Sequence, residues 1–288
     1  MPEIPEMEIY RDFLNRYVSG KQVTGVQVER TRSINRDVGE FIRLVRGVRV
    51  EKVERRAKFL VFHLDNDLYL LNHMMLDGRL YYGPPGLDRE AGTEPAEPGM
   101  ENGQFRLPGK AHVVFALSDN RSLYFCDLRL GYLHLLDGAE LAREISDLGI
   151  EPLSSDYNWA GFAGLLSGRR GKIKPFLIAQ KYLAGLGNAY SNEVLFASGI
   201  MPDRAAGSLT EAEQRRLFDE IPRTLREAIS LGGYIEEPFT AGDSLSGGYI
   251  PHFRVYDRGG EPCLVCGTPI SEKKLSGRWT YYCVRCQH

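Results

Sequence analysis

The chain has 288 residues, of which 43% are hydrophobic and 26% are charged, and this is the composition of an ordinary globular protein. The length fits roughly two domains, and there is no run of about 18 apolar residues, so no membrane-spanning helix is expected. The start of the chain lacks a basic segment followed by an apolar one, which argues against a secretory signal and makes the cytoplasm the expected compartment.

The formal net charge of −2 does not favour a nucleic acid as partner, but the charges are unevenly spread. Residues 84–103 contain five acidic side chains and one basic one, whereas residues 251–288 contain six basic and three acidic ones. Because DNA binds to local basic patches, the second segment is compatible with DNA as a partner in spite of the net charge. Random clustering on a solvated surface is the alternative for either patch.

The first predicted element is a helix over residues 5–18, where apolar residues recur at helical spacing until Gly20 ends the pattern. It is preceded by Pro2 and Glu3 in the stretch MPEIPE. A frayed end is one interpretation of this stretch, since chain termini are usually poorly ordered.

From residue 22 to about 135, short runs of β-branched and aromatic residues are separated by Gly, Asn-Asp or Ser-Asp-Asn. Many strands with little intervening helix predict a β-sandwich or barrel. The Pro-, Gly- and Glu-rich residues 84–103 are interpreted as a long surface loop of this domain. Cys126, alone in the apolar run LYFCDL, is interpreted as a buried core residue.

After about residue 150 the pattern becomes helical. Residues 172–200 predict two helices joined by a tight connection at AGLGN. A further helix begins with a capping box of Thr210 and Glu213 and ends at a Gly-Gly pair, and Pro222 inside it predicts a kink or a break. From about residue 236 the pattern returns to strand and turn.

Four of the five cysteines form the pattern C-x2-C-x16-C-x2-C. Each CxxC pair can place two thiolates on one tight turn, and two such turns complete a tetrahedral Zn²⁺ site. Disulfides are the alternative, but cytosolic thiols are kept reduced. Four protein ligands leave the metal no open position, so its role would be structural. The predicted ligands are Cys263, Cys266, Cys283 and Cys286.

The 16 residues between the two cysteine pairs predict a hairpin with Ser276-Gly277 at its turn, so Arg278 would project from the tip. A short hairpin with little core depends on its metal. Such a module usually binds a partner, and the basic tip favours nucleic acid, with a protein partner as the alternative.

Four stretches taken together resemble the formamidopyrimidine-DNA glycosylase/endonuclease VIII family. They are PEIPE, RRAKFLVF around Lys58, GLGNAYSNEVLF around Asn188 and the closing VYDRGGEPCLVCGTPI…GRWTYYCVRCQ. They occur in the family's order over nearly the whole chain.

The resemblance implies an α+β multidomain protein. Residues 1–138 would form a catalytic β-sandwich domain with an N-terminal helix, residues 150–235 a helix–two-turns–helix DNA-binding domain, and residues 236–288 a zinc finger hairpin with four cysteine ligands. The implied activity is that of a bifunctional DNA glycosylase and abasic-site lyase of base excision repair. Its partner would be damaged double-stranded DNA, its cofactor one structural Zn²⁺, and its working form a monomer.

The resemblance also gives the first residues a role. Removal of Met1 would leave Pro2 with a free secondary amine, which is partly uncharged near neutral pH. This amine would attack sugar C1′, expel the base and form an iminium that promotes β-elimination, with δ-elimination left open. Glu3 is the implied general acid and base, and Glu6 helps to organise the site. A retained Met1 would lock the Pro2 nitrogen in an amide and close this route.

The remaining implied residues hold the DNA. Four residues match phosphate contacts of the family: Lys58, His73, Asn188 and Arg278. Of these, Lys58 is also counted among the catalytic residues. The alternatives are a solvated lysine within a strand, a structural histidine and an N-cap asparagine. Among the residues that fill the gap left by a flipped nucleotide, Leu76 matches the wedge and Arg129 matches the arginine that faces the orphaned base.

Some positions depart from the family pattern. Leu130 and Gly131 stand where it has a basic and an aromatic residue, and Asp77 and Ala179 also differ. Oxidised purines of the formamidopyrimidine and 8-oxoguanine type are favoured as substrates. Oxidised pyrimidines or hydantoins are one alternative, and a catalytically decayed, zinc-dependent damaged-DNA-binding protein is another. The protein is expected to act at the nucleoid.

Overall fold

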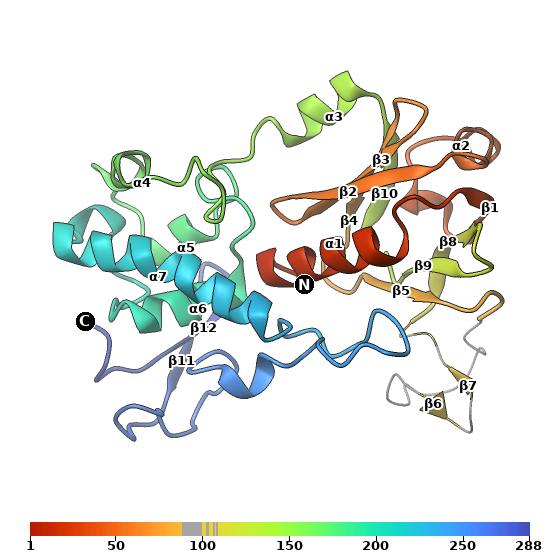
Figure 1. Cartoon of the computed structure of the whole chain (residues 1–288). Helices are drawn as coiled ribbons and strands as arrows, with labels where there is room; N and C mark the ends of the chain where they lie inside the picture. Colours follow the sequence, from red (N-terminus) through yellow and green to blue (C-terminus); the bar gives the residue numbers. More distant parts are fainter. Residues whose placement is uncertain (88–99, 102–103, 106, 108) are drawn as a thin grey trace. The chain divides into compact units, whose positions relative to one another are not determined.

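The computed structural model describes residues 1–87, 100–101, 104–105, 107 and 109–288 (Figure 1). The chain divides into two compact units. Unit 1 contains Met1–Ser146 and Leu231–Gly248, and unit 2 contains Asp147–Ser230 and Tyr249–His288. Unit 1 therefore includes a segment, Leu231–Gly248, that follows the last long helix of unit 2. The sequence pattern did not indicate that the chain returns to unit 1 at this point.

Two antiparallel four-stranded sheets form the body of unit 1. The first has the order β1 (Val23–Val28), β8 (Ala111–Leu117), β9 (Ser122–Cys126), β5 (Arg79–Gly83). The second has the order β10 (Tyr132–Leu136), β4 (Tyr69–His73), β3 (Phe59–Leu64), β2 (Val50–Arg56). Their inner faces share one core, in which the rings of Phe62 and Phe125 lie 6.1 Å apart. The predicted β-sandwich is confirmed.

Strand β9 is buried along its whole length because both of its faces are covered. One face supplies Phe125 to the core between the sheets. The other face joins a smaller cluster that contains Tyr81, Tyr124 and Cys126. Cys126 is fully buried, which confirms the prediction for this residue.

The predicted N-terminal helix is α1 (Ile4–Tyr17). Pro5 lies in its first turn, where the missing N–H group would have had no intrahelical partner. Met7 and Leu14 are buried in the core of unit 1. Pro2 and Glu3 are buried as well, so the start of the chain is packed and the frayed-end alternative is wrong.

Two helices of unit 1 were not predicted. α2 (Val38–Val45) is rich in β-branched residues, which favour a strand assignment, yet the Asp37 side chain caps it by accepting from the N–H groups of Gly39 and Glu40. α3 (Gly138–Ile145) begins with a capping box of Asp137 and Glu140. A short 3-10 helix, η1 (Thr31–Ser33), lies between β1 and α2.

Most of the segment predicted as a long surface loop, residues 88–99 and 102–103, lies outside the described residues. The described part contains β6 (Met100–Glu101) and β7 (Gln104–Phe105), which pair antiparallel. None of the helices in the described ranges has the length and apolar character needed to cross a bilayer.

The helices of unit 2 are α4 (Trp159–Leu166), α5 (Ile173–Leu177), α6 (Asn188–Ala197), η2 (Ala206–Ser208) and α7 (Glu211–Ser230). Thr210 and Glu213 form the predicted capping box of α7, and Thr210 N–H donates to Glu213 Oε2 at 2.8 Å. Of the kink or break predicted at Pro222, the break does not occur, because one helix continues through this residue. Pro222 leaves the carbonyl of Phe218 without its helical donor, and the Tyr157 hydroxyl donates to that carbonyl at 3.0 Å.

The C-terminal part of unit 2 contains η3 (Ile250–His252) and one hairpin, β11 (Ser271–Leu275) and β12 (Arg278–Tyr282). Ser276 and Gly277 connect the strands with φ of +49° and +77°. Two positive φ angles are those of a type I′ turn, which suits the twist of a tight hairpin. The predicted hairpin and its turn are confirmed.

Candidate functional site

Two buried carboxylates lie beside the start of the chain. Glu3 is 2% exposed and Glu6 is 3% exposed. They form the reciprocal capping box of α1, in which Glu3 N–H donates to Glu6 Oε2 at 2.8 Å and the Glu3 carboxylate accepts from Glu6 N–H. These bonds to backbone donors offset part of the cost of burying the two side chains.

The segment after α7 fixes Glu6 from a second side. Tyr234 N–H donates to Glu6 Oε1 at 3.1 Å, and the Tyr234 hydroxyl donates to the carbonyl oxygen of Met1 at 2.6 Å. Gly233 has a φ of +63°, and a Cβ atom at this residue would lie 2.6 Å from Glu6 Oε1. The left-handed φ and this close approach both favour glycine, so the Gly-Gly pair that ends α7 also shapes the site.

The N-terminal amine lies where its neutral form is favoured. Burial, and next the Arg79 guanidinium, lower the pKa of the Met1 amino group, while Glu3 and Glu6 act in the opposite direction. Arg79 is held by Glu237, with 3.0 Å between Nε and Oε2. A neutral amine has its lone pair free for attack on an electrophile, so the surroundings of the Met1 amine suit a nucleophile.

Lys58 lies in the two-residue turn between β2 and β3, and not within a strand as predicted. It is 6% exposed, so the solvated-lysine alternative is wrong. The preceding residue, Ala57, has a φ of +53°, and its carbonyl accepts from Arg55 Nη1 at 3.0 Å. Glu8 on α1 accepts from Arg55 Nε and pairs with Arg11. A buried ion pair thus ties α1 to the turn that carries Lys58.

His73, the last residue of β4, is held as a neutral ring. Its Nδ1 accepts from Met75 N–H at 3.0 Å, and its ring lies between Phe59 and Tyr132, with centroids 4.7 and 5.8 Å away. Burial, and next the charge of Lys58, lower the pKa of His73 to about 4. At neutral pH the ring proton is therefore on Nε2, which can donate a hydrogen bond.

Two neighbouring loops expose leucine side chains. Leu76, after β4, is 52% exposed, and Leu130, between β9 and β10, is 63% exposed. The loops approach closely at Gly131, where a Cβ atom would lie 2.6 Å from the carbonyl oxygen of His73. Arg129, next to Leu130, is also exposed. The two loops together present apolar side chains and one cation to the outside.

In unit 2, Asn188 is the first residue of α6, and the N-cap position is taken by Gly187, so the N-cap alternative for Asn188 is wrong. Within the described part of the chain, Asn188 Oδ1 has no hydrogen-bond partner. The connection before α6 is shaped by Gln180, which accepts from Gly185 N–H at 2.8 Å and donates to the Leu186 carbonyl at 2.8 Å.

A buried lysine joins α5 and α6 to the hairpin. Lys174 is 1% exposed, and its Nζ donates to Asn192 Oδ1, to the Trp279 carbonyl and to Thr280 Oγ1, at 2.9, 2.9 and 2.8 Å. Both hairpin partners belong to β12, whose first residue is the exposed Arg278. The strand that begins with Arg278 is thus anchored to the helix that begins with Asn188.

Glu193 anchors the chain before the cysteines to the same helix. Its carboxylate is 1% exposed and accepts from the N–H groups of Arg254, Val255 and Tyr256 at 2.9, 3.0 and 2.8 Å. Burial raises the pKa of Glu193, and the three backbone donors oppose that effect. Glu193 lies in the GLGNAYSNE motif of the sequence. The motif itself does not indicate that this carboxylate accepts from the chain before the cysteines.

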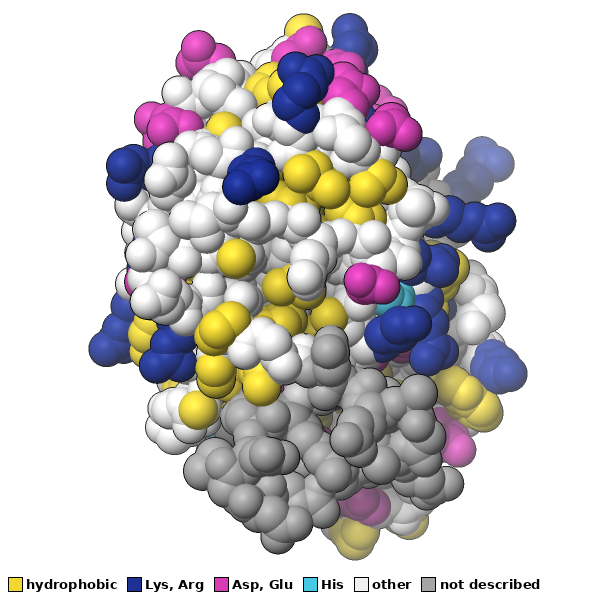
Figure 2. Space-filling view, turned by 90° about the vertical axis from the view of Figure 1, so that its right-hand side faces the viewer, with side chains coloured by type: hydrophobic (Ala, Val, Ile, Leu, Met, Phe, Trp, Pro, Cys, Tyr) yellow, Lys and Arg dark blue, Asp and Glu magenta, His cyan; other side chains and the backbone are white. Residues whose placement is uncertain are grey.

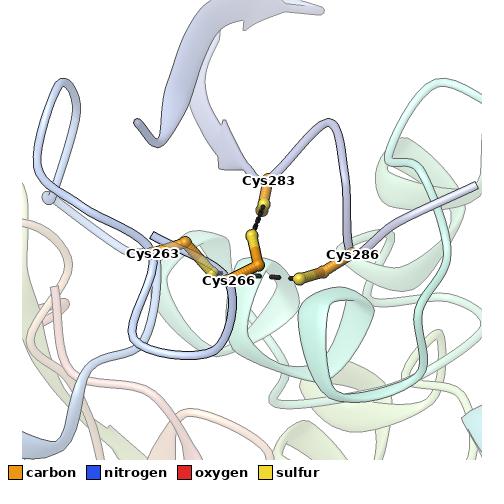
Figure 3. Close-up of side chains that lie close together, drawn as sticks. All are labelled: Cys263, Cys266, Cys283 and Cys286. Atoms are coloured by element: carbon orange, nitrogen blue, oxygen red, sulfur yellow. Dashed lines mark hydrogen bonds between the residues drawn. The ribbon is translucent and has the colours of Figure 1, made fainter. Parts of the chain in front are cut away.

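The four predicted metal ligands converge (Figure 3). Their sulfur atoms lie within 4.8 Å of one another, with 3.9 Å between Cys263 and Cys286 and 3.4 Å between Cys266 and Cys283. Tetrahedral zinc with Zn–S bonds of about 2.3 Å requires sulfur pairs about 3.8 Å apart, so the cluster fits the metal. All are free thiols, which rules out the disulfide alternative. Hydrogen bonds from Thr268 lower the pKa of Cys266, which favours a thiolate at this ligand, whereas burial raises the pKa of Cys283 and Cys286. The cysteines form one structural zinc site.

The predicted residues are distributed over both units. Pro2, Glu3, Glu6, Lys58, His73, Leu76 and Arg129 lie in unit 1, and Asn188, Arg278 and the four cysteines lie in unit 2. Arg79 and Tyr234 were missed, because Tyr234 is 228 residues away from its partner Glu6 and no local motif marks it. Figure 2 shows acidic side chains gathered near the top of one face and basic ones along its right-hand side, so a small net charge coexists with local basic patches.

Three family models match successive parts of the chain. The formamidopyrimidine-DNA glycosylase N-terminal domain matches residues 1–133, and the formamidopyrimidine-DNA glycosylase H2TH domain matches residues 148–239. The zinc finger found in FPG and IleRS matches residues 260–288.

Full-length relatives and solved structures agree with these matches. The chain is 36% identical to the formamidopyrimidine-DNA glycosylase of Shouchella clausii, over 100% of this chain and 99% of the relative, and 33% identical to that of Listeria innocua, over 100% of both. It is similar to Lactococcus lactis Fpg in complex with abasic-site DNA, with a TM-score of 0.86 and 26% identity over 99% of each chain. The complex of that protein with N7-benzyl-Fapy-dG DNA gives a TM-score of 0.87 and 27% identity over 100% of each chain. The chain belongs to the formamidopyrimidine-DNA glycosylase family.

Proposed function

We propose that this protein is a bifunctional DNA glycosylase and abasic-site lyase that removes oxidised purines, of the formamidopyrimidine and 8-oxoguanine type, in base excision repair. The observation that carries the proposal is the pair of buried carboxylates, Glu3 and Glu6, around the start of a chain whose second residue is proline. The relatives of that name and the Lactococcus lactis complexes with abasic-site and Fapy-dG DNA support the substrate class.

Pro2 is the nucleophile in this proposal. Removal of Met1 frees its secondary amine, whose lone pair forms a bond to C1′ of the lesion nucleotide. The bond from C1′ to the base breaks, and the base leaves with the electron pair and takes up a proton. The nitrogen, now bonded to C1′ and positively charged, gives up its proton and regains a lone pair. The C1′–O4′ bond then opens, O4′ receives the electron pair of that bond and a proton, and the nitrogen lone pair completes a C1′=N⁺ iminium.

The iminium drives strand cleavage. It acidifies the C2′ proton, and once a base has removed that proton, the 3′ phosphate leaves with the electron pair of the C3′–O bond. Glu3 carries protons to O4′ and away from C2′, since it is the buried carboxylate that directly follows the nucleophile. Glu6 keeps Glu3 in place through its bond to Glu3 N–H. Water releases Pro2 from the cleaved sugar.

Four side chains hold the phosphates next to the lesion. Lys58 supplies a cation near the amine, and His73 supplies an Nε2–H donor from a ring that does not charge at neutral pH. Asn188 contributes its amide and the first N–H groups of α6, where a helix attracts anions. Arg278 contributes a guanidinium from the tip of the hairpin. Such contacts position the duplex without reading its sequence.

The exposed loops fill the gap in the base stack. Leu76 enters as the apolar wedge, and Arg129 faces the orphaned base. Leu130 adds a second apolar side chain beside Arg129. Zinc holds the hairpin that presents Arg278, so the metal serves binding and takes no part in the chemistry. One nucleophile per chain suffices for one duplex, so we expect a monomer that works on DNA at the nucleoid.

The test uses protein whose Met1 has been removed, as verified by mass. Duplexes carrying Fapy-dG, 8-oxoguanine, an abasic site or an undamaged guanine are incubated with this protein, and base release and strand cleavage are measured separately. We expect both products from the two damaged purines and cleavage at the abasic site. Binding to these duplexes without cleavage of any of them would contradict the proposal, and so would a Pro2→Gly variant that is trapped as strongly as wild type through a lysine.

A further inference from the structure

One tyrosine hydroxyl reaches the group that is bonded to the Pro2 nitrogen. Tyr234 Oη donates to the carbonyl oxygen of Met1 at 2.6 Å, while the N–H group of the same residue donates to Glu6 at 3.1 Å. Gly232 and Gly233 precede it with φ of +91° and +63°, a backbone path that favours glycine. Ile235, which follows, is buried in the core of unit 1. The residues before and after Tyr234 therefore fix the position of its hydroxyl.

The Met1 carbonyl group is bonded to the atom that the sugar must reach, the Pro2 nitrogen. Its carbon is bonded to the Pro2 nitrogen at about 1.33 Å, as C1′ is bonded to that nitrogen in the covalent intermediate. Its oxygen is bonded to this carbon, as the ring oxygen O4′ is bonded to C1′. In stereochemical terms, the carbonyl carbon stands in for C1′ and the carbonyl oxygen for a substituent of C1′.

We propose that Tyr234 is a further catalytic residue, whose hydroxyl donates a hydrogen bond to O4′ of the lesion nucleotide while the C1′–O4′ bond breaks. This inference rests on the Schiff-base chemistry proposed above and names the group that assists its ring-opening step. The electron pair of the C1′–O4′ bond goes to O4′, and the proton that O4′ takes up is carried by Glu3. Tyr234 keeps its own proton. Because charge develops on O4′ only as the bond breaks, this hydrogen bond is stronger in the transition state than before it.

The competing explanation is that Tyr234 only fastens the first residue to the fold. Processing removes Met1, and the acceptor of this hydrogen bond leaves with it. This contact to Met1 is then absent from the active protein, whereas a role toward O4′ begins at that point. The backbone bond to Glu6 does not depend on Met1, so the tyrosine stays in place.

The first experiment compares Tyr234→Phe with Tyr124→Phe in processed protein. Tyr124 is the matched control, because its hydroxyl also donates to a carbonyl of unit 1, that of Pro84, at 2.5 Å. Loss of one donor aimed at a developing oxyanion slows a reaction by about 10²-fold or more. We expect Tyr234→Phe to lower the single-turnover rate of borohydride-trapped adduct formation on Fapy-dG duplex at least 10-fold, and Tyr124→Phe to lower it less than 2-fold. Equal rates for wild type and Tyr234→Phe would overturn the inference.

The second experiment needs no catalysis. Two duplexes carry uncleavable abasic analogues, a tetrahydrofuran and a cyclopentane, which differ only in having an oxygen or a methylene group at the O4′ position. We expect wild-type protein to bind the tetrahydrofuran duplex several-fold more tightly, and Tyr234→Phe to bind both equally. A wild type that binds both analogues equally, or a Tyr234→Phe variant that keeps the preference, would overturn the inference. Failure of the Schiff-base proposal has a different signature, which is a wild type that forms no adduct at all.

Discussion

The ion pair between α1 and the Lys58 turn allows a quantitative test of how the site is held. Arg55 is replaced by Met, which keeps the apolar length of the side chain and removes its charge. The Arg55 side chain is 4% exposed and that of Glu8 is 11% exposed, so the change leaves a buried carboxylate. Removing one partner of such a pair costs about 3–5 kcal/mol, and we expect about 3 because Arg11 still pairs with Glu8.

The control is Lys52→Met on the same hairpin. Lys52 and Glu54 pair at 2.5 Å, but both side chains are 53% exposed, so this change should cost less than about 1 kcal/mol. Both tryptophans, Trp159 and Trp279, lie in unit 2, so their fluorescence does not report on unit 1. Hydrogen exchange of the amides of α1 and β2 is therefore the appropriate assay.

The pair is expected to matter for activity too. Since Arg55 also holds the Ala57 carbonyl, Arg55→Met should slow adduct formation by loosening the turn that carries Lys58. The double variant Glu8→Met with Arg55→Met removes both charges and should recover most of the lost stability. The reasoning is refuted if Arg55→Met destabilises unit 1 no more than Lys52→Met does.

Three further predictions concern other parts of the molecule. The pKa of His73 is lowered by burial and then by Lys58 to about 4, against an ordinary 6.5, so its contribution to stability is complete above pH 6.5 and is lost as the pH falls toward 4, by at most about 3 kcal/mol. Urea unfolding at pH 7 and pH 4.5 should therefore show a smaller loss at the lower pH for His73→Asn than for wild type, and equal losses would contradict this. Cys283→Ser should lose bound zinc and affinity for abasic-site duplex while the amides of the sandwich keep their protection, and unchanged affinity would count against it. Glu193→Ala leaves three backbone N–H groups without their acceptor, at about 1–3 kcal/mol each, so it should weaken zinc retention far more than Glu211→Ala, whose side chain is 71% exposed.

The features that local patterns encode were predictable. The capping box at Thr210 and Glu213, the turn at Ser276-Gly277 and the strands of the sandwich depend on neighbouring residues, and short-range chemistry determines them. The zinc site was predictable for the same reason, because each CxxC pair fixes two ligands on one turn. The resemblance carried the family assignment, and the matches to three family models confirm it.

Features that depend on distant partners were not predictable. Pro222 remains inside one helix because Tyr157 supplies a donor for the Phe218 carbonyl from 61 residues away. Tyr234 reaches Met1 across 233 residues, and it does so through a segment that leaves α7 to pack in unit 1. The residues around Lys58 have the composition of a strand, so a strand was predicted. Its position in a turn depends on the left-handed conformation of Ala57 and on the hydrogen bond from Arg55 to the Ala57 carbonyl.

The central claim is that the nitrogen of Pro2 forms the bond to the sugar, and peptide mapping of the trapped complex tests it most directly. Processed protein is reduced with borohydride on a duplex with a single lesion, digested with protease and nuclease, and analysed by tandem mass spectrometry. The added mass of the reduced sugar fragment is expected on the amino-terminal peptide, at Pro2, and should be missing from protein that retains Met1. A sugar adduct on Lys58 or another lysine, or an adduct of equal yield in protein that retains Met1, would contradict the account.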